Sequence, residues 1–76
     1  MKPTESQIGL IFRWFNWELP TPVAQDATKW LEKNATRKQV SAEIARLKDL
    51  RDANKLNKES CFDSELWKEY YGQRAK

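Results

Sequence analysis

The chain has 76 residues, of which 39% are apolar and 33% are charged, and its formal net charge is +3. A chain of this length is expected to form one small domain, here residues 1–76, with no room for a second core. It contains no histidine and a single cysteine, Cys61, which excludes a Ser-His-Asp triad, a histidine-containing or four-cysteine zinc site and an intramolecular disulfide.

These absences shape the functional expectations. Without a general-base histidine, a set of metal ligands or a glycine-rich phosphate loop, we expect no enzymatic activity, no metal and no cofactor. No segment has the pattern of a signal peptide, and the longest apolar-rich stretch, residues 8–17, is interrupted by Arg13 and Asn16. Because a lone free cysteine also suits a reducing compartment, we expect a cytoplasmic protein that does not contact membranes.

The first predicted helix covers residues 5–18. Thr4 and Gln7 have the spacing of a capping box, which marks the start of a helix. Apolar residues then recur at helical spacing on the face expected to meet the core: Ile8, Ile11, Phe12, Phe15 and Leu19. The Pro20 that follows predicts the end of this helix.

The second predicted helix covers residues 22–33. Thr21 is expected to cap it, with Pro22 at its first helical position and Asn34 as a left-handed stop. The residues expected to face the core are Val23, Ala27, Trp30 and Leu31.

The third predicted helix covers residues 37–54. It opens with a second capping box, formed by Thr36 and Gln39. The residues expected to face the core are Val40, Ile44, Leu47 and Leu50. Glu43 lies near the edge of this apolar stripe.

A polar loop and a short last helix complete the predicted fold. Asp63 is expected to cap a helix over residues 64–71, and Gly72 is expected to close it. Phe62 and Trp67 have the spacing of a hydrophobic staple. The predicted fold class is therefore all-α, a compact domain of three main helices and a short C-terminal helix.

Aromatic residues supply the leading functional hypothesis. Leu10, Trp14 and Trp17 form a second apolar stripe along the first helix, and Trp67 and Tyr71 belong to the last helix. Because Trp and Tyr dominate interaction hot spots, these five residues predict a surface that binds a protein partner. The alternative is that the last helix packs on the stripe and that these side chains are core. Four tryptophans are difficult to bury in so short a chain, so we expect at least one to be exposed.

Basic residues supply the competing hypothesis. Residues 34–58 carry seven basic and three acidic side chains, whereas the rest of the chain is close to neutral. A nucleic-acid-binding face on the third helix and the following loop would comprise Arg37, Lys38, Gln39, Ser41, Arg46, Lys48, Lys55 and Lys58. The second and third helices would then form a helix-turn-helix. An ordinary solvated helix face is the alternative explanation for these charges, and self-association of the chain is a third functional hypothesis.

Two segments resemble small bacterial and phage helical domains of unknown function. The stretch from Thr4 to Ile8 with Ile11 is similar to a Thr-x-x-Gln-Ile-x-x-Ile helix of these domains. Residues 36–47 are similar to their Thr-Lys/Arg-x-x-Ala-Ser-x-x-Ile-x-x-Leu helix, with Val40 where alanine is usual. The resemblance implies a non-catalytic accessory module, such as a phage or mobile-element protein that modulates a host complex.

Overall fold

A computed structural model describes residues 1–74, and the side chains of residues 1–72. This part of the chain contains α-helices and one 3₁₀ turn, and no strand. The elements in chain order are α1 (Glu5–Glu18), α2 (Thr21–Asn34), α3 (Arg37–Asp52), η1 (Ser60–Phe62) and α4 (Glu65–Arg74). The predicted all-α class, with three main helices and a shorter last one, is confirmed.

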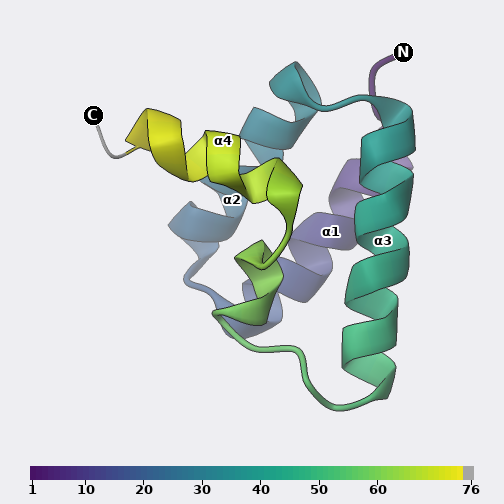
Figure 1. Cartoon of the computed structure of the whole chain (residues 1–76), viewed down its shortest axis with the longest axis vertical. Helices are drawn as coiled ribbons and strands as arrows, with labels where there is room; N and C mark the ends of the chain where they lie inside the picture. Colours follow the sequence, from purple (N-terminus) through teal and green to yellow (C-terminus); the bar gives the residue numbers. More distant parts are fainter. Residues whose placement is uncertain (75–76) are drawn as a thin grey trace.

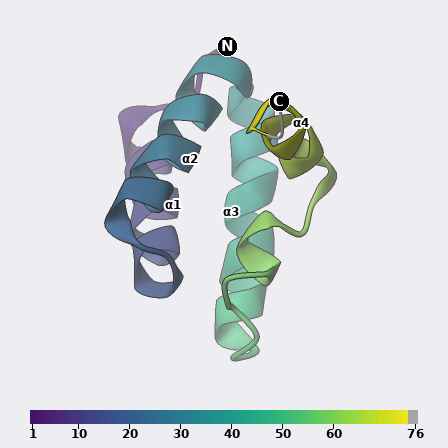
Figure 2. The same cartoon turned by 90° about the vertical axis from the view of Figure 1, so that its left-hand side faces the viewer.

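The first three helices form a base on which the C-terminal segment lies. α1 and α2 run in opposite directions, and α1 contacts both α2 and α3 (Figures 1 and 2). After α3 the chain passes along one end of the molecule, forms η1 and then returns as α4, which crosses in front of α2 in Figure 1. Trp67 of α4 contacts both Phe15 of α1 and Trp30 of α2, so α4 covers the open side of the base.

Both predicted capping boxes are present and explain where α1 and α3 begin. The Thr4 hydroxyl accepts the Gln7 backbone N–H at 3.1 Å, and the Gln7 side chain accepts the Thr4 backbone N–H at 3.0 Å. Thr36 and Gln39 make the same pair of bonds at 3.1 and 2.8 Å. Each box satisfies backbone donors that a helix start would otherwise leave without partners.

The start of α2 differs from the prediction. The helix begins at Thr21, one residue before Pro22, and Pro20 occupies the N-cap without a side-chain hydrogen bond. The Thr21 hydroxyl instead donates to the Asn16 side-chain oxygen at 2.8 Å. Thr21 therefore ties the corner between α1 and α2 rather than capping α2, because the sharp turn brings the Asn16 acceptor within its reach.

The prediction of Asn34 as a left-handed residue after α2 is wrong, and the residue with a left-handed conformation is Asn54, after α3. Asn34 remains helical, and α2 ends through Ala35 in an extended conformation. α3 ends at Asp52, two residues before the predicted limit, and Asn54 has a φ of 58°. It is the one non-glycine residue with positive φ in the described chain. Asparagine adopts this conformation more readily than most residues. Asn34 and Asn54 both follow a predicted helical pattern, so residue type alone does not show which of them is left-handed.

The limits of α4 also differ from the prediction. Asp63 follows η1 and closes that turn instead of capping α4, and Gly72 lies inside α4 instead of ending it. A glycine weakens a helix by roughly 1 kcal/mol relative to alanine but does not forbid it. The expected contact between Phe62 and Trp67 is present, with ring centroids 5.0 Å apart.

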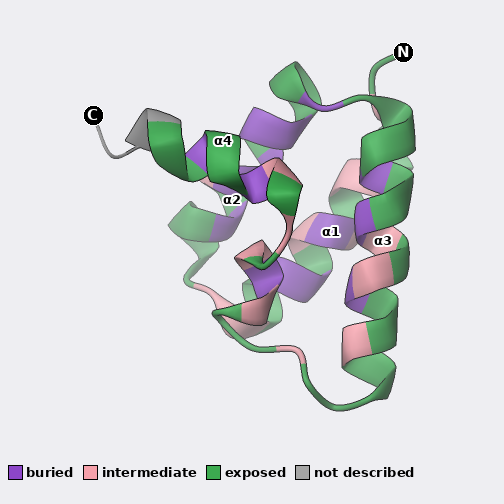
Figure 3. Cartoon of the chain, in the orientation of Figure 1, coloured by how far each residue is buried: buried purple, intermediate pink, exposed green. Residues whose placement is uncertain are grey.

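Trp67 is the centre of the core. Its ring centroid lies 5.4 Å from that of Phe15, 5.7 Å from that of Trp30 and 5.4 Å from that of Tyr70. The buried apolar residues line the inward faces of every element (Figure 3). They are Ile11, Trp14, Phe15, Ala24, Ala27, Trp30, Leu31, Ala35, Val40, Leu47, Cys61, Trp67 and Tyr70.

Substitution of Trp67 by alanine is expected to lower the free energy of unfolding by about 3–5 kcal/mol. Removing a fully buried aromatic ring costs about 3–5 kcal/mol, against a total stability of roughly 4–11 kcal/mol for a domain of this size. The matched control is Trp17→Ala, which removes a largely exposed ring and should cost about 1 kcal/mol or less. Urea denaturation followed by circular dichroism measures both, and equal losses in the two variants would contradict this account of the core.

Candidate binding surface

The structure divides the five predicted protein-binding residues between core and surface. Trp14 and Trp67 are 3% and 0% exposed, so the prediction of a surface role for them is wrong. Leu10 is half-buried and packs against the core. Trp17 and Tyr71 are 58% and 50% exposed, which confirms the expectation that at least one tryptophan reaches the surface.

A residue that is distant in the sequence helps to cover Trp14, which belongs to the buried core. The guanidinium of Arg51 on α3 lies 5.2 Å from the centre of the Trp14 ring. A guanidinium over an indole face is a favourable cation–π arrangement, and the long Arg side chain also covers apolar surface. α3 thereby covers this part of the stripe on α1.

Trp17 lies at a depression between the end of α1 and the loop before η1. The depression is lined by Trp17, Glu18, Asn57, Lys58 and Glu59. The wall formed by the loop is ordered by reciprocal hydrogen bonds: the Asn57 backbone N–H donates to the Ser60 hydroxyl at 2.8 Å, and the Ser60 N–H donates to the Asn57 side-chain oxygen at 2.9 Å. The site therefore combines one large apolar ring with carboxylate, ammonium and amide groups on a formed loop.

Tyr71 occupies a different environment from Trp17. Its ring packs edge-on against Phe62, with centroids 5.3 Å apart, and it is not among the residues that line the Trp17 depression. Partial burial raises the pKa of the Tyr71 hydroxyl, and the neighbouring Cys61 adds to the rise. Tyr71 is thus a neutral aromatic side chain on α4, separate from the depression.

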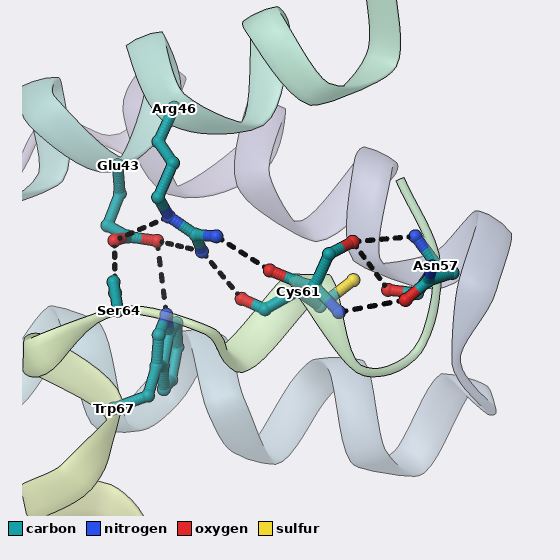
Figure 4. A network of polar contacts seen from close by, with 7 residues as sticks. Glu43, Arg46, Asn57, Cys61, Ser64 and Trp67 are labelled. Atoms are coloured by element: carbon teal, nitrogen blue, oxygen red, sulfur yellow. Dashed lines mark hydrogen bonds and ion pairs between the residues drawn. The ribbon is translucent and has the colours of Figure 1, made fainter. Parts of the chain in front are cut away.

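A buried carboxylate joins α3 to the C-terminal segment (Figure 4). Glu43 is 4% exposed, and its two oxygens accept hydrogen bonds from Arg46 at 3.1 and 2.7 Å. The Ser64 hydroxyl donates to one of the same oxygens, and the Trp67 indole N–H donates to the other at 3.1 Å. Glu43 thus holds α4 and the segment before it through both of its oxygens.

Arg46 completes this network on the side of η1. Its guanidinium donates to the backbone carbonyls of Ser60 at 2.6 Å and Cys61 at 2.8 Å (Figure 4). The guanidinium makes four hydrogen bonds inside the protein, so the structure gives no support to the prediction of Arg46 as a nucleic-acid contact. The signal that could have revealed this network is an acidic residue within the apolar stripe of the third helix, followed three positions later by an arginine.

The remaining predicted nucleic-acid contacts do not form one face. Arg37 holds the N-terminal residues, since its backbone N–H donates to the Met1 carbonyl at 2.9 Å and its Nε to the Lys2 carbonyl at 3.3 Å. Gln39 belongs to the capping box, and Ser41 accepts a hydrogen bond from the Gln7 side chain at 2.9 Å. These groups contribute to the fold at one end of α3.

The exposed lysines are spread along the molecule. Lys38 lies on the first turn of α3, Lys48 on its last turns, and Lys55 and Lys58 beyond its end. A helix of 16 residues spans about 24 Å, which separates the two ends of the set. Near Lys48, the exposed carboxylates at positions 49 and 52 reduce the positive potential further.

Cys61 is a packed thiol. It is fully buried, and burial raises its pKa from the ordinary 9.0 to about 11, with Glu18 and Glu43 adding to the rise and Arg46 opposing it. The thiolate is the reactive form of cysteine, so this environment disfavours nucleophilic chemistry.

Further features of the described chain bear on ligands. No described helix is both long enough and apolar enough to cross a membrane. Among the described residues, no group of three or more His, Cys, Asp or Glu side chains is placed to hold a metal ion. Comparisons with protein-family models, with curated proteins and with solved structures found no match. The resemblance to bacterial and phage helical domains therefore stays a prediction.

Substitution of Glu43 by alanine is expected to lower the free energy of unfolding by about 3 kcal/mol or more. The reason is that Arg46, Ser64 and Trp67 lose their shared acceptor and the guanidinium is left without its carboxylate. The matched control is Glu65→Ala, which removes the carboxylate of another i,i+3 ion pair, with Lys68, that is exposed and should cost no more than about 1 kcal/mol. Similar losses on urea denaturation would contradict the assigned role of Glu43.

The raised pKa of Cys61 predicts a loss of stability at alkaline pH. Between pH 9 and 11 the unfolded chain releases the thiol proton while the folded chain retains it, so unfolding becomes more favourable as the pH rises. This thiol should contribute a loss of roughly 2 kcal/mol across that window. Urea denaturation of the Cys61→Ala variant should show a smaller loss over the same pH range, and identical profiles for the two proteins would exclude the thiol as the cause.

Proposed function

We propose that the chain is a non-enzymatic binding module that docks a protein partner on the depression around Trp17. The observation that carries this proposal is the exposure of Trp17, at 58%, in a protein that buries its other three tryptophans. A domain this small gains stability from every aromatic ring that it can bury. An indole left in water beside a formed depression is therefore a candidate anchor for a partner.

The composition of the depression supports a protein as the partner. Tryptophan is enriched among residues that dominate interface energies, and such anchors are commonly surrounded by a polar rim. Glu18, Lys58 and Glu59 supply such a rim, with both signs of charge. Covering the exposed part of the Trp17 ring would contribute roughly 2–3 kcal/mol to binding.

The nucleic-acid hypothesis has less support. One of its arginines is bound inside the protein, and its lysines lie at both ends of α3. A mixed-charge surface around Trp17 also lacks the positive potential that phosphate binding requires. The two hypotheses differ in their expected response to salt and to nuclease.

Capture of proteins from a lysate of the native host tests the proposal. The immobilised chain should retain a specific protein, and Trp17→Ala should weaken its retention by roughly 30-fold or more, since each 1.4 kcal/mol corresponds to a factor of ten. The matched control is Tyr71→Ala, which removes another half-exposed aromatic ring from outside the depression and should leave capture unchanged.

Nuclease treatment and salt titration complete this experiment. Retention that survives nuclease and depends weakly on salt is expected for the proposed interface. Retention that disappears with nuclease, or falls steeply with salt, would indicate nucleic-acid binding instead. Absence of any captured protein that depends on Trp17 would contradict the proposal.

A further inference from the structure

We propose that the C-terminal segment, residues 60–74, can exchange between two copies of this chain, so that α4 of each copy docks on α1–α3 of the other. The inference does not rest on the proposed function, although the hinge includes Asn57, Lys58 and Glu59, which line one side of the depression around Trp17. It rests on the hinge that connects α3 to η1 and on the kind of contacts that attach the segment to the base.

The hinge reverses the direction of the chain without glycine or proline. There is no glycine or proline anywhere between Arg37 and Tyr71. The reversal of the chain instead requires Asn54 to adopt a left-handed conformation, with a φ of 58°. Asparagine adopts this conformation more readily than most residues that carry a Cβ atom, but less readily than glycine. If Asn54 returns to a helical conformation, no residue of the hinge prevents α3 from continuing, and the segment then points away from its own base.

The hydrogen bonds of the hinge belong to two local units. The Lys55 backbone N–H donates to the Leu50 carbonyl at 2.8 Å, which attaches Lys55 to α3. Asn57 is bonded reciprocally to Ser60, which attaches it to η1. Between them lies Leu56, and one bond from the Ser60 hydroxyl to the Lys55 carbonyl, at 3.1 Å, links the two units. Opening the chain at Leu56 would break this one linking bond and would remove Leu56, which is partly buried, from its packing against the core.

The contacts of the segment can all be formed again in a second copy. Ser64 and Trp67 donate to Glu43, and Arg46 donates to the carbonyls of η1, so each of these bonds joins the segment to the base. The aromatic contacts of Trp67 with Phe15 and Trp30 likewise cross between the two parts. In an exchanged dimer these interactions form between chains, and only the conformation of the hinge changes.

When the segment leaves the base formed by α1–α3, the exposed groups of that base require a specific set of partners. An opened monomer would expose the apolar rings around Trp67 to water and leave Glu43 and Arg46 with fewer hydrogen-bond partners, which is costly. The complementary group must supply an indole with a free N–H, a hydroxyl and two backbone carbonyls in the spacing of this segment. A second copy of residues 60–74 supplies that set.

A pair of substitutions at Asn54 tests the exchange. Asn54→Gly removes the Cβ penalty and should favour the folded-back monomer, whereas Asn54→Ala raises the penalty and favours a straight helix. The ratio of dimer to monomer in sedimentation velocity, measured over a range of concentrations, should be roughly tenfold or more higher for Asn54→Ala than for Asn54→Gly. The dimer-to-monomer ratio of the wild-type chain should lie between the ratios of the two variants. If Asn54→Ala fails to fold, the wild-type ratio should still exceed that of Asn54→Gly.

The identity of the dimer is tested in the same samples. When isotope-labelled and unlabelled chains are mixed and refolded together, filtered nuclear Overhauser spectra should show contacts between Trp67 of one chain and Phe15 of the other. The dimer should persist in Trp17→Ser, since Trp17 lies beside the hinge residues Asn57, Lys58 and Glu59 and does not take part in the exchanged contacts of Trp67. A folded protein that stays monomeric in every variant, or a dimer without these contacts between chains, would overturn the proposal.

Discussion

The buried carboxylate of Glu43 is the interaction on which the arrangement of the C-terminal half depends. It accepts hydrogen bonds from Arg46 of α3, from Ser64 before α4 and from Trp67 of α4. No buried side-chain nitrogen or oxygen in the described chain lacks a partner. A buried ion pair is a poor source of net stability compared with apolar packing, but an incomplete one is costly. Glu43 therefore adds two directional hydrogen bonds, from Ser64 and Trp67, to the aromatic packing that holds α4 on the base.

The size of the chain explains why the surface around Trp17 exists. The space enclosed by α1, α2 and α3 is filled by Phe15 and by the rings of Trp30 and Trp67, and Trp14 is covered by Arg51. Trp17 is one turn further along α1, at the end of the helix, and remains 58% exposed because no element within the described residues covers it. The same helix thus supplies both a central face of the core and the exposed anchor of the proposed interface.

Three of the arginines of this basic chain make contacts that support the fold. Arg46 supports η1, Arg51 covers Trp14, and Arg37 holds the first residues against α3. Each of these arginines combines a long apolar side chain with a planar group of several donors, which suits such bridging roles better than lysine does. The lysines of the same region remain at the surface and give the protein its basic character.

The sequence alone determined the four helices of this protein, both limits of α1 and the start of α3, because capping boxes and apolar periodicity act between residues that are close in the chain. It also indicated that some aromatic surface would remain exposed. Only the tertiary structure decided which tryptophan that is, because the cover over Trp14 comes from α3 and the pocket of Trp67 comes from three helices. The role of Glu43 was likewise decided by partners more than twenty positions away, which a local pattern of residues cannot specify.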